Sequence, residues 1–197
     1  MALLAYEVES KFSSANIAKI KAIASRLGVD PNWLMIVFRF ESANTFLPSV
    51  RNKNSGAVGL IQFTTVAIKG WNVTLDQLAK MTVDQQLDYV EKYLSPYKGK
   101  MVDLYNLYLA VFAPAYIGRP NSQKVYASPS NAYTSNKSLD TNNDGIITVG
   151  EIKEVITRYI PTGYSSGVST LTEVAQPLPL ALILIVLLIL YFLLKRN

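Results

Sequence analysis

The chain has 197 residues, carries a formal net charge of +5 and contains neither cysteine nor histidine. The missing residue types exclude disulfides, thiolate or histidine metal sites, and catalysis by Ser-His-Asp or Cys-His arrangements. Proton transfer near neutral pH must therefore fall to a carboxyl, a lysine or a tyrosine with a shifted pKa. A basic balance suits an anionic polymer. No run of Lys or Arg marks a nucleic-acid surface, so no nucleic-acid partner is expected.

Residues 1–120 show mostly helical patterning, which predicts a mainly α protein. The apolar residues within 17–27 fall on one stripe that ends at Gly28. Asp30 and Pro31 are typical of a helix N-cap followed by proline at the first helical position. We expect further helices at about 74–79, 83–93 and 101–112, no extensive sheet, and a loop over 122–138.

Glu41 lies at the end of the next predicted helix, 32–41, which is nearly all apolar and is expected to be deeply buried. A carboxyl at that position should be partly desolvated, which disfavours its charged form and raises its pKa toward neutrality. A glycosidase acid needs such a pKa. The competing interpretation is a helix-terminal acid that forms an ion pair with Arg39 or Arg51.

A glycine-punctuated segment, NSGAVGLIQF, follows over residues 54–63. Glycine lets a backbone approach a ligand closely, and the amide of Gln62 can hydrogen-bond a sugar. Glu41-Ser42 together with this segment resembles the lysozyme-like lytic transglycosylase family, in which a helix ends in Glu-Ser and a G-x-x-G-L-M-Q segment follows. Gly56, Gly59, Leu60 and Gln62 match that second motif, and Ile61 replaces its Met.

The resemblance implies a lysozyme-like helical domain that cleaves peptidoglycan glycan strands, with Glu41 as the catalytic acid–base. It implies a single-carboxylate mechanism that closes a 1,6-anhydro ring. The lack of an acidic residue after Glu41 and before Asp76 agrees with that mechanism. An aspartate folded back beside the site would instead make the protein a muramidase hydrolase; the candidates are Asp76, Asp84, Asp88 and Asp103. The substrate-binding residues implied are Ser42, Gly59, Gln62, Phe63 and Phe112.

The third motif of that family, A-Y-N-A-G, corresponds best to residues 110–115, A-V-F-A-P-A. Phe112 cannot supply the tyrosine hydroxyl that normally reaches the glutamate, and Ala113 lacks the asparagine amide. This departure leaves open a protein that binds glycan without cleaving it. The candidates to replace the hydroxyl are Tyr105, Tyr108 and Tyr116.

A second pattern, DTNNDGIITVGE over residues 140–151, fits the 12-residue EF-hand loop at every ligand position. An apolar stripe follows it, as an exiting helix should show. Since sensors use paired loops and this one is single, we expect a structural calcium that holds the C-terminal segment to the domain. The predicted ligands are Asp140, Asn142, Asp144, Ile146 through its carbonyl, Thr148 and Glu151.

The C-terminal sequence from 178 to 194 is apolar throughout and is followed by Lys195 and Arg196. Its length is at the short end of the roughly 17–25 residues that span a bilayer, so a single membrane anchor is expected. The predicted organisation is a lysozyme-like transglycosylase domain (1–120), a calcium segment (121–160), a flexible linker (161–177) and a transmembrane helix (178–194).

The sequence as a whole predicts a membrane-anchored, peptidoglycan-cleaving enzyme, in a virion membrane or a bacterial envelope. The absence of a signal peptide, together with a tail anchor, resembles virion-associated lysins of bacteriophages. The expected partners are peptidoglycan glycan strands, the lipid bilayer and, in a virion, other virion proteins. Two alternatives stay open: a non-catalytic peptidoglycan-binding protein and a calcium-dependent structural membrane protein.

Overall fold

The computed structural model describes residues 4–164, which form a mainly helical protein with one small antiparallel sheet. Its seven α-helices are α1 (Ser14–Leu27), α2 (Pro31–Glu41), α3 (Leu75–Ala79), α4 (Val83–Leu94), α5 (Leu104–Phe112), α6 (Asn131–Asn136) and α7 (Val149–Thr157). The sheet pairs β1 (Lys124–Ala127) with β2 (Ile146–Thr148). Short 3₁₀ helices η1 (Ser95–Tyr97), η2 (Pro114–Tyr116) and η3 (Lys137–Leu139) complete the elements.

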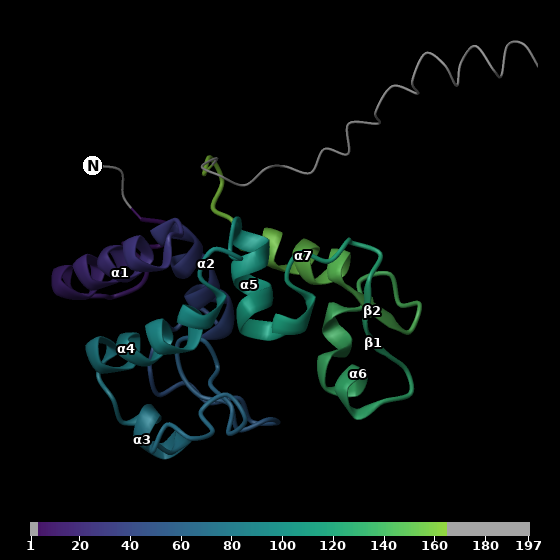
Figure 1. Ribbon diagram of the computed structural model, residues 1–197, viewed down its shortest axis with the longest axis horizontal. Coiled ribbons are helices and arrows are strands. Elements are labelled where there is room, and N and C mark those ends of the chain that lie inside the picture. The colour runs from purple at the N-terminus through teal and green to yellow at the C-terminus, as the bar shows by residue number, and fades with distance from the viewer. Residues whose placement is uncertain (1–3, 165–197) are drawn as a thin grey trace, which may run out of the picture.

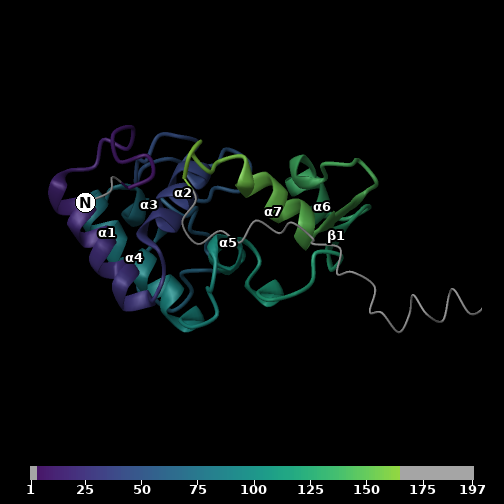
Figure 2. The ribbon, with the colours of Figure 1, turned by 90° about the horizontal axis from the view of Figure 1, so that it is seen from above.

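Two views at right angles show how the elements are arranged. Figures 1 and 2 place α1 to α4 on one side of α5, and α6, β1 and α7 on the other. Helix α7 packs against both α2 and α5. One hydrophobic core cluster therefore includes residues from both sides, among them Ile23 of α1 and Ile152 of α7.

The predicted helix ends follow from local capping. Ser13 accepts a hydrogen bond from the Asn16 amide, and Gly28, at φ 75°, closes α1. The side chain of Asp30 accepts a 2.8 Å hydrogen bond from the Asn32 amide and caps α2, which has proline at its first position. These two helices, α3 and α4 are confirmed.

The last predicted helix of residues 1–120 begins later than expected. It starts at Leu104, because the Asp103 carboxylate accepts a 2.7 Å hydrogen bond from the Asn106 amide and caps α5 there. Residues 101–103 therefore lie outside it.

The prediction of a loop over 122–138 is wrong, because this segment holds β1, α6 and the start of η3. The polar composition hid a capped helix: the Ser130 hydroxyl accepts a 3.1 Å hydrogen bond from the amide of Tyr133, whose ring is buried. Strand β1 exists only through its pairing with β2, which is distant in the sequence. Local composition could not show that pairing.

The C-terminal predictions fall largely outside the described residues. Residues 161–164, the start of the predicted linker, form a turn, and the Tyr164 hydroxyl donates a 2.9 Å hydrogen bond to Asp30. The rest of that linker and the predicted transmembrane helix 178–194 lie beyond the region described. Among residues 4–164, no helix combines the length and the apolar character needed to cross a membrane.

A buried glutamine on α4 holds the loops that follow α2. Gln86 is fully buried, and its Nε2 donates hydrogen bonds to the carbonyls of Pro48 (3.1 Å) and Leu78 (3.0 Å). Its Oε1 accepts a 2.8 Å hydrogen bond from the Leu60 amide. At Gly59, a Cβ would lie 2.3 Å from Gln86 Oε1, so this close approach requires glycine. One side chain thus fixes three separate segments.

Replacing Gln86 with leucine should leave the buried Pro48 carbonyl and the buried Leu60 amide without partners, while the Leu78 carbonyl keeps the Met81 amide as a donor at 3.1 Å. We expect Gln86→Leu to lower the free energy of unfolding by roughly 2–4 kcal/mol, measured by urea denaturation. Gln85→Leu is the matched control, because Gln85 is exposed and serves only the α4 cap. Equal losses in both variants would contradict the role assigned to Gln86.

Candidate active site

Glu41 is the last residue of α2, whose residues from Trp33 to Phe38 are buried. The chain turns sharply after it, with positive φ angles at Ala43, Asn44 and Phe46. Ser42 makes this turn: its hydroxyl, fully buried, accepts a 2.8 Å hydrogen bond from the Phe46 amide. Ser42 therefore supports the backbone behind Glu41 and does not line the cleft.

Glu41 opens into a cleft of about 250 Å³. Four segments meet there: the end of α2, the loop between residues 52 and 64, the end of α5, and α6. The cleft is lined by Glu41, Asn52, Ser55, Ala57, Ile61, Gln62, Thr64, Val111, Phe112 and Asn136. Of the residues expected from the sequence, it brings together Glu41, Gln62 and Phe112.

Burial controls the proton affinity of Glu41. Desolvation raises the pKa of its carboxyl to about 8 from the ordinary value of 4.5, although the residue keeps some contact with solvent. Within the region described, no cation pairs with this carboxyl and no group donates a hydrogen bond to it. It therefore holds a proton at neutral pH, as a general acid requires.

The interpretation of Glu41 as one member of an ion pair is not supported. Arg39 pairs with Glu9 at 3.3 Å and covers the Tyr6 ring at 4.1 Å. Arg51 pairs with Asp76 at 2.6 Å. Both arginines named by the sequence thus have other acidic partners, and Glu41 is left without one among residues 4–164.

No second carboxyl lines the Glu41 cleft within the described chain. Asp76 is held by Arg51, while Asp84 and Asp88 both pair with Lys19, at 3.1 and 2.8 Å. Asp103 caps α5. A retaining or inverting glycosidase needs a second carboxylate roughly 5–9.5 Å from the first, and none of these four aspartates lines the cleft.

The glycine-punctuated loop presents Gln62 to the cleft through a short antiparallel turn. Val58 bridges both Arg51 and Phe63, and the amide of Phe63 donates a 2.7 Å hydrogen bond to the Val58 carbonyl. Gln62 adopts φ 51°, and its Nε2 donates a 3.1 Å hydrogen bond to the Gly59 carbonyl. This leaves Gln62 Oε1 as an acceptor beside Glu41.

Phe63 and Gly59 belong to the same loop but do not line the Glu41 cleft. Phe63 is buried and contributes to a smaller cavity next to the cleft, shared with Gln62 and Tyr93. Gly59 contacts Gln86 and is absent from the cleft lining. Both residues shape the loop, whereas Gln62 is the one whose side chain lines the cleft.

The aromatic wall of the cleft comes from α5. Phe112 stacks on Tyr108, with ring centroids 5.9 Å apart and planes inclined by 15°. Tyr108 also meets Phe40 edge to face at 5.2 Å. Burial, together with the charge of Glu41, raises the pKa of Tyr108 well above 10, so its hydroxyl keeps its proton. Tyr108, one of the three tyrosines considered from the sequence, thus lies close enough to Glu41 for that charge to contribute to its raised pKa.

The other two tyrosines are engaged elsewhere, and a fourth was missed. Tyr105 accepts a 3.2 Å hydrogen bond from Thr157, and Tyr116 donates one of 3.4 Å to the Val125 carbonyl. Tyr93 of α4 lies near the site: burial, then the charges of Tyr97 and Glu41, raise its pKa to about 12. No pattern in the sequence links α4 to the cleft, so only the fold could reveal Tyr93.

In the predicted calcium loop, carboxylates of the loop accept hydrogen bonds from backbone amides of the same loop. The buried Asp140 carboxylate accepts hydrogen bonds from the amides of Asp144 (3.2 Å) and Gly145 (3.0 Å). The buried Glu151 carboxylate accepts them from the amides of Thr141 (3.0 Å) and Thr148 (2.9 Å). Gly145 has φ 84°, the conformation that the sharp turn at the sixth loop position requires.

The donor set of this loop is oxygen-rich and negatively charged. No Lys or Arg in residues 4–164 forms an ion pair with Asp140, Asp144 or Glu151. In the same part of the chain, no three acidic side chains converge as a ready metal cluster. Calcium would therefore have to draw Glu151 away from the amides it accepts from and use amide and backbone oxygens as well. Such a mixed oxygen set is the kind calcium takes.

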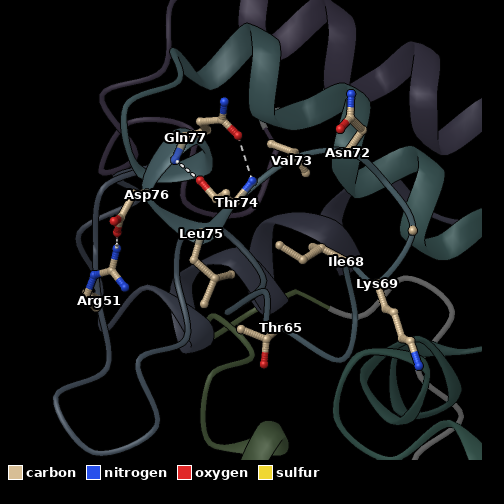
Figure 3. Close-up of a pocket in the computed structure, with 11 residues that line it drawn as sticks. Arg51, Thr65, Ile68, Lys69, Asn72, Val73, Thr74, Leu75, Asp76 and Gln77 are labelled. Atoms are coloured by element: carbon tan, nitrogen blue, oxygen red, sulfur yellow. Dashed lines mark hydrogen bonds and ion pairs between the residues drawn. The ribbon is translucent and has the colours of Figure 1, made fainter.

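A larger hollow of about 820 Å³, which Glu41 does not line, lies elsewhere on the described part of the chain (Figure 3). It lies between the loop around Lys69 and α3, and Figure 3 shows Asp76 turned toward Arg51 and bonded to it. Thr74 and Gln77 are occupied by the α3 capping box. Asp76 is the one acid among the described residues that line this hollow, and it is paired with Arg51. The smaller Glu41 cleft is therefore the better candidate.

The raised pKa of Glu41 should appear as a pH-dependent stability difference. The folded protein holds this proton more tightly than the unfolded chain, with pKa about 8 against 4.5. The stability it confers is present below about pH 4.5 and is lost as the pH rises through about 8. Glu41→Gln stays neutral, so near pH 8 it should melt roughly 4–10 °C above wild type, and near pH 4 at the same temperature.

Differential scanning calorimetry over that pH range would check this expectation. Glu9→Gln is the control: it removes an exposed carboxyl outside the cleft and should melt within about 2 °C of wild type throughout. A constant difference between Glu41→Gln and wild type at every pH would contradict the assigned pKa.

No protein-family model matches the chain, and a search of curated proteins finds no match. The chemistry of the Glu41 cleft therefore has to be inferred from its own residues.

Proposed function

We propose that the protein is a lytic transglycosylase that cleaves peptidoglycan glycan strands with Glu41 as its one catalytic carboxyl. The observation that carries this proposal is a buried, unpaired Glu41 with a pKa of about 8, in a cleft lined by no second carboxyl among the described residues. A helix ending in Glu-Ser, followed by a glycine-rich loop that presents Gln62, further supports a lysozyme-like arrangement.

In the proposed reaction, Glu41 acts first as an acid and then as a base. Its proton passes to the glycosidic oxygen between N-acetylmuramic acid and N-acetylglucosamine as the bond from that oxygen to C1 breaks. The carboxylate then removes the proton of the muramoyl 6-hydroxyl while O6 bonds to C1, which closes a 1,6-anhydro ring. Glu41 regains its proton, and no water is consumed.

The departure in the third motif is compatible with this scheme. Tyr108 is buried and stacks on Phe112, and Tyr93 lines the smaller cavity next to the cleft. Burial and the charge of Glu41, with that of Tyr97 as well for Tyr93, raise the pKa of both and keep their hydroxyls protonated. A neutral hydroxyl near Glu41 can stabilise its carboxylate after the first proton transfer. We assign this part to Tyr108, the candidate from the sequence whose pKa responds to Glu41.

A non-catalytic glycan-binding protein is the second candidate. The observation that favours it is Phe112, which lines the cleft where the family has a hydroxyl. In that case Glu41 would only hydrogen-bond a sugar, and its replacement would change affinity without changing the polymer.

We also propose that the loop 140–151 binds one structural calcium. Asp140, Asn142, Asp144, Thr148 and Glu151 would supply side-chain oxygens, and Ile146 its carbonyl. Within residues 4–164 the loop's acids have no ion-pair partner, which supports a cation there. Strand β2 lies inside the loop and pairs with β1, so a bound cation would stabilise this pairing.

For the setting, we propose a membrane-anchored enzyme of a virion membrane or a bacterial envelope. The apolar sequence of 178–194 supports an anchor. Such an anchor would keep the cleft close to a bilayer while it acts on the neighbouring wall. Virion proteins would be further partners if the setting is a bacteriophage.

Cleavage is tested by loss of turbidity of purified peptidoglycan. Wild type should clear the suspension, Glu41→Gln should reduce the rate at least about 1,000-fold, and Glu9→Gln should retain it. The rate should fall as the pH rises above about 8, where Glu41 loses its proton. Mass spectrometry of the products should show 1,6-anhydro ends.

Two outcomes would redirect the proposal. Reducing ends in place of 1,6-anhydro ends would make the protein a hydrolase. Binding to peptidoglycan by wild type without any clearing, and with an affinity that Glu41→Gln changes, would leave the non-catalytic candidate.

Calcium should raise the melting temperature of the wild-type protein by several degrees at millimolar concentration. Glu151→Gln should abolish that rise, because the amide replaces a carboxylate ligand. Glu154→Gln, one turn further along α7 and exposed in an ion pair with Arg158, is the matched control and should keep it. A rise that survives Glu151→Gln would exclude this loop as the site.

A further inference from the structure

The cleft has a wall that comes from outside the predicted glycan-cleaving domain. Asn136, the last residue of α6, lines the same cleft as Glu41, Gln62 and Phe112. In Figure 1, α6 lies on the opposite side of α5 from α1 to α4. The two sides of the molecule therefore both contribute residues to this cleft.

The side chain of Asn136 is held in one orientation with hydrogen-bonding capacity to spare. Its Nδ2 donates a 2.9 Å hydrogen bond to the Ala132 carbonyl on the preceding turn of α6. Within residues 4–164, no group donates to its Oδ1, and the residue is partly exposed to the cleft. One acceptor oxygen and one N–H thus remain for a ligand.

Asn136 brings a side-chain carboxamide to the cleft from α6, whereas the end of α5 supplies none. Ala113 stands where the third motif has asparagine, and it is buried and absent from the cleft lining. An N-acetylated sugar carries one amide N–H and one carbonyl. The free oxygen and N–H of an asparagine can pair with both.

We propose that α6 forms a wall of the glycan-binding cleft and that Asn136 hydrogen-bonds the N-acetyl group of a sugar bound beside Glu41. The inference rests on the proposed function for the nature of the ligand. It adds a substrate-binding residue in the segment that precedes the calcium loop. Neither the charge nor a sequence motif of that segment indicates a binding residue there.

Tyr133 holds α6 in position and does not itself contact the ligand. Its ring is buried, and its hydroxyl donates a 2.7 Å hydrogen bond to Asp140 Oδ2. The same oxygen accepts the Gly145 amide at 3.0 Å. The helix that carries Asn136 is therefore fastened to the first residue of the loop 140–151, so Tyr133 is a positioning residue.

The test measures binding of the β-1,4-linked tetramer of N-acetylglucosamine by isothermal titration calorimetry, in full-length protein carrying Glu41→Gln so that nothing is cleaved. Adding Asn136→Ala should weaken the affinity roughly 3- to 10-fold, the range for one neutral hydrogen bond. Ser135→Ala, an exposed neighbour on the same helix, should leave it within about twofold. Both variants should melt within about 2 °C of their parent.

Tyr133→Phe separates positioning from general stability. Alone, it should weaken tetramer binding about two- to fivefold, because α6 loses its bond to Asp140. Combined with Asn136→Ala, it should cause no additional loss, since the residue it positions is already gone. A purely structural effect would instead add to that of Asn136→Ala.

The outcomes distinguish this inference from the proposed function. Equal affinity of Asn136→Ala and its parent would overturn the role of Asn136 and leave Glu41 catalysis intact. Tetramer binding lost in Asn136→Ala, in a protein whose wild type does not clear peptidoglycan, would support α6 as a glycan wall and refute cleavage. A parent that does not bind the tetramer would overturn the glycan wall, whereas cleavage is decided separately by whether wild type clears peptidoglycan.

Discussion

The architecture of the cleft depends on the side-chain amide of Gln86. Its three hydrogen bonds, to Pro48, Leu60 and Leu78, fix the loop after α2 against α3 and α4 without any regular sheet. A loop of this length ordinarily lies on the surface and moves. Here a fully buried amide satisfies its backbone groups from within, so Gln62 can be presented beside Glu41 from an irregular segment.

The chemistry of the site follows from what is kept away from Glu41. Each nearby basic residue named by the sequence has another acidic partner, Glu9 for Arg39 and Asp76 for Arg51. Burial therefore acts on the carboxyl without an opposing charge and raises its pKa. These surface ion pairs contribute little to stability, but they give both arginines an acidic partner other than Glu41.

The sequence predicted features whose cause is local. Asp30 and Pro31 define the start of α2, and the apolar run after them places Glu41 at its buried end. Features that depend on contacts between distant segments could not be predicted. Strand β1 needs β2 as its partner. Tyr93 reaches the cavity next to the Glu41 cleft, and Asn136 reaches the cleft itself, only through the tertiary placement of α4 and α6. The polar composition before the calcium loop even suggested that α6 did not exist.

The way Glu41 acquires its proton has a consequence for ligand binding. Because desolvation raises its pKa, a ligand that displaces further water from the cleft without donating a hydrogen bond or a positive charge to the carboxyl raises that pKa further. Occupancy and protonation are then linked, and filling the cleft near pH 8 would take up hydrogen ions from the buffer. Binding of such a ligand would therefore favour the protonated, acidic form of Glu41 even at a pH where Glu41 of the free protein is largely ionised.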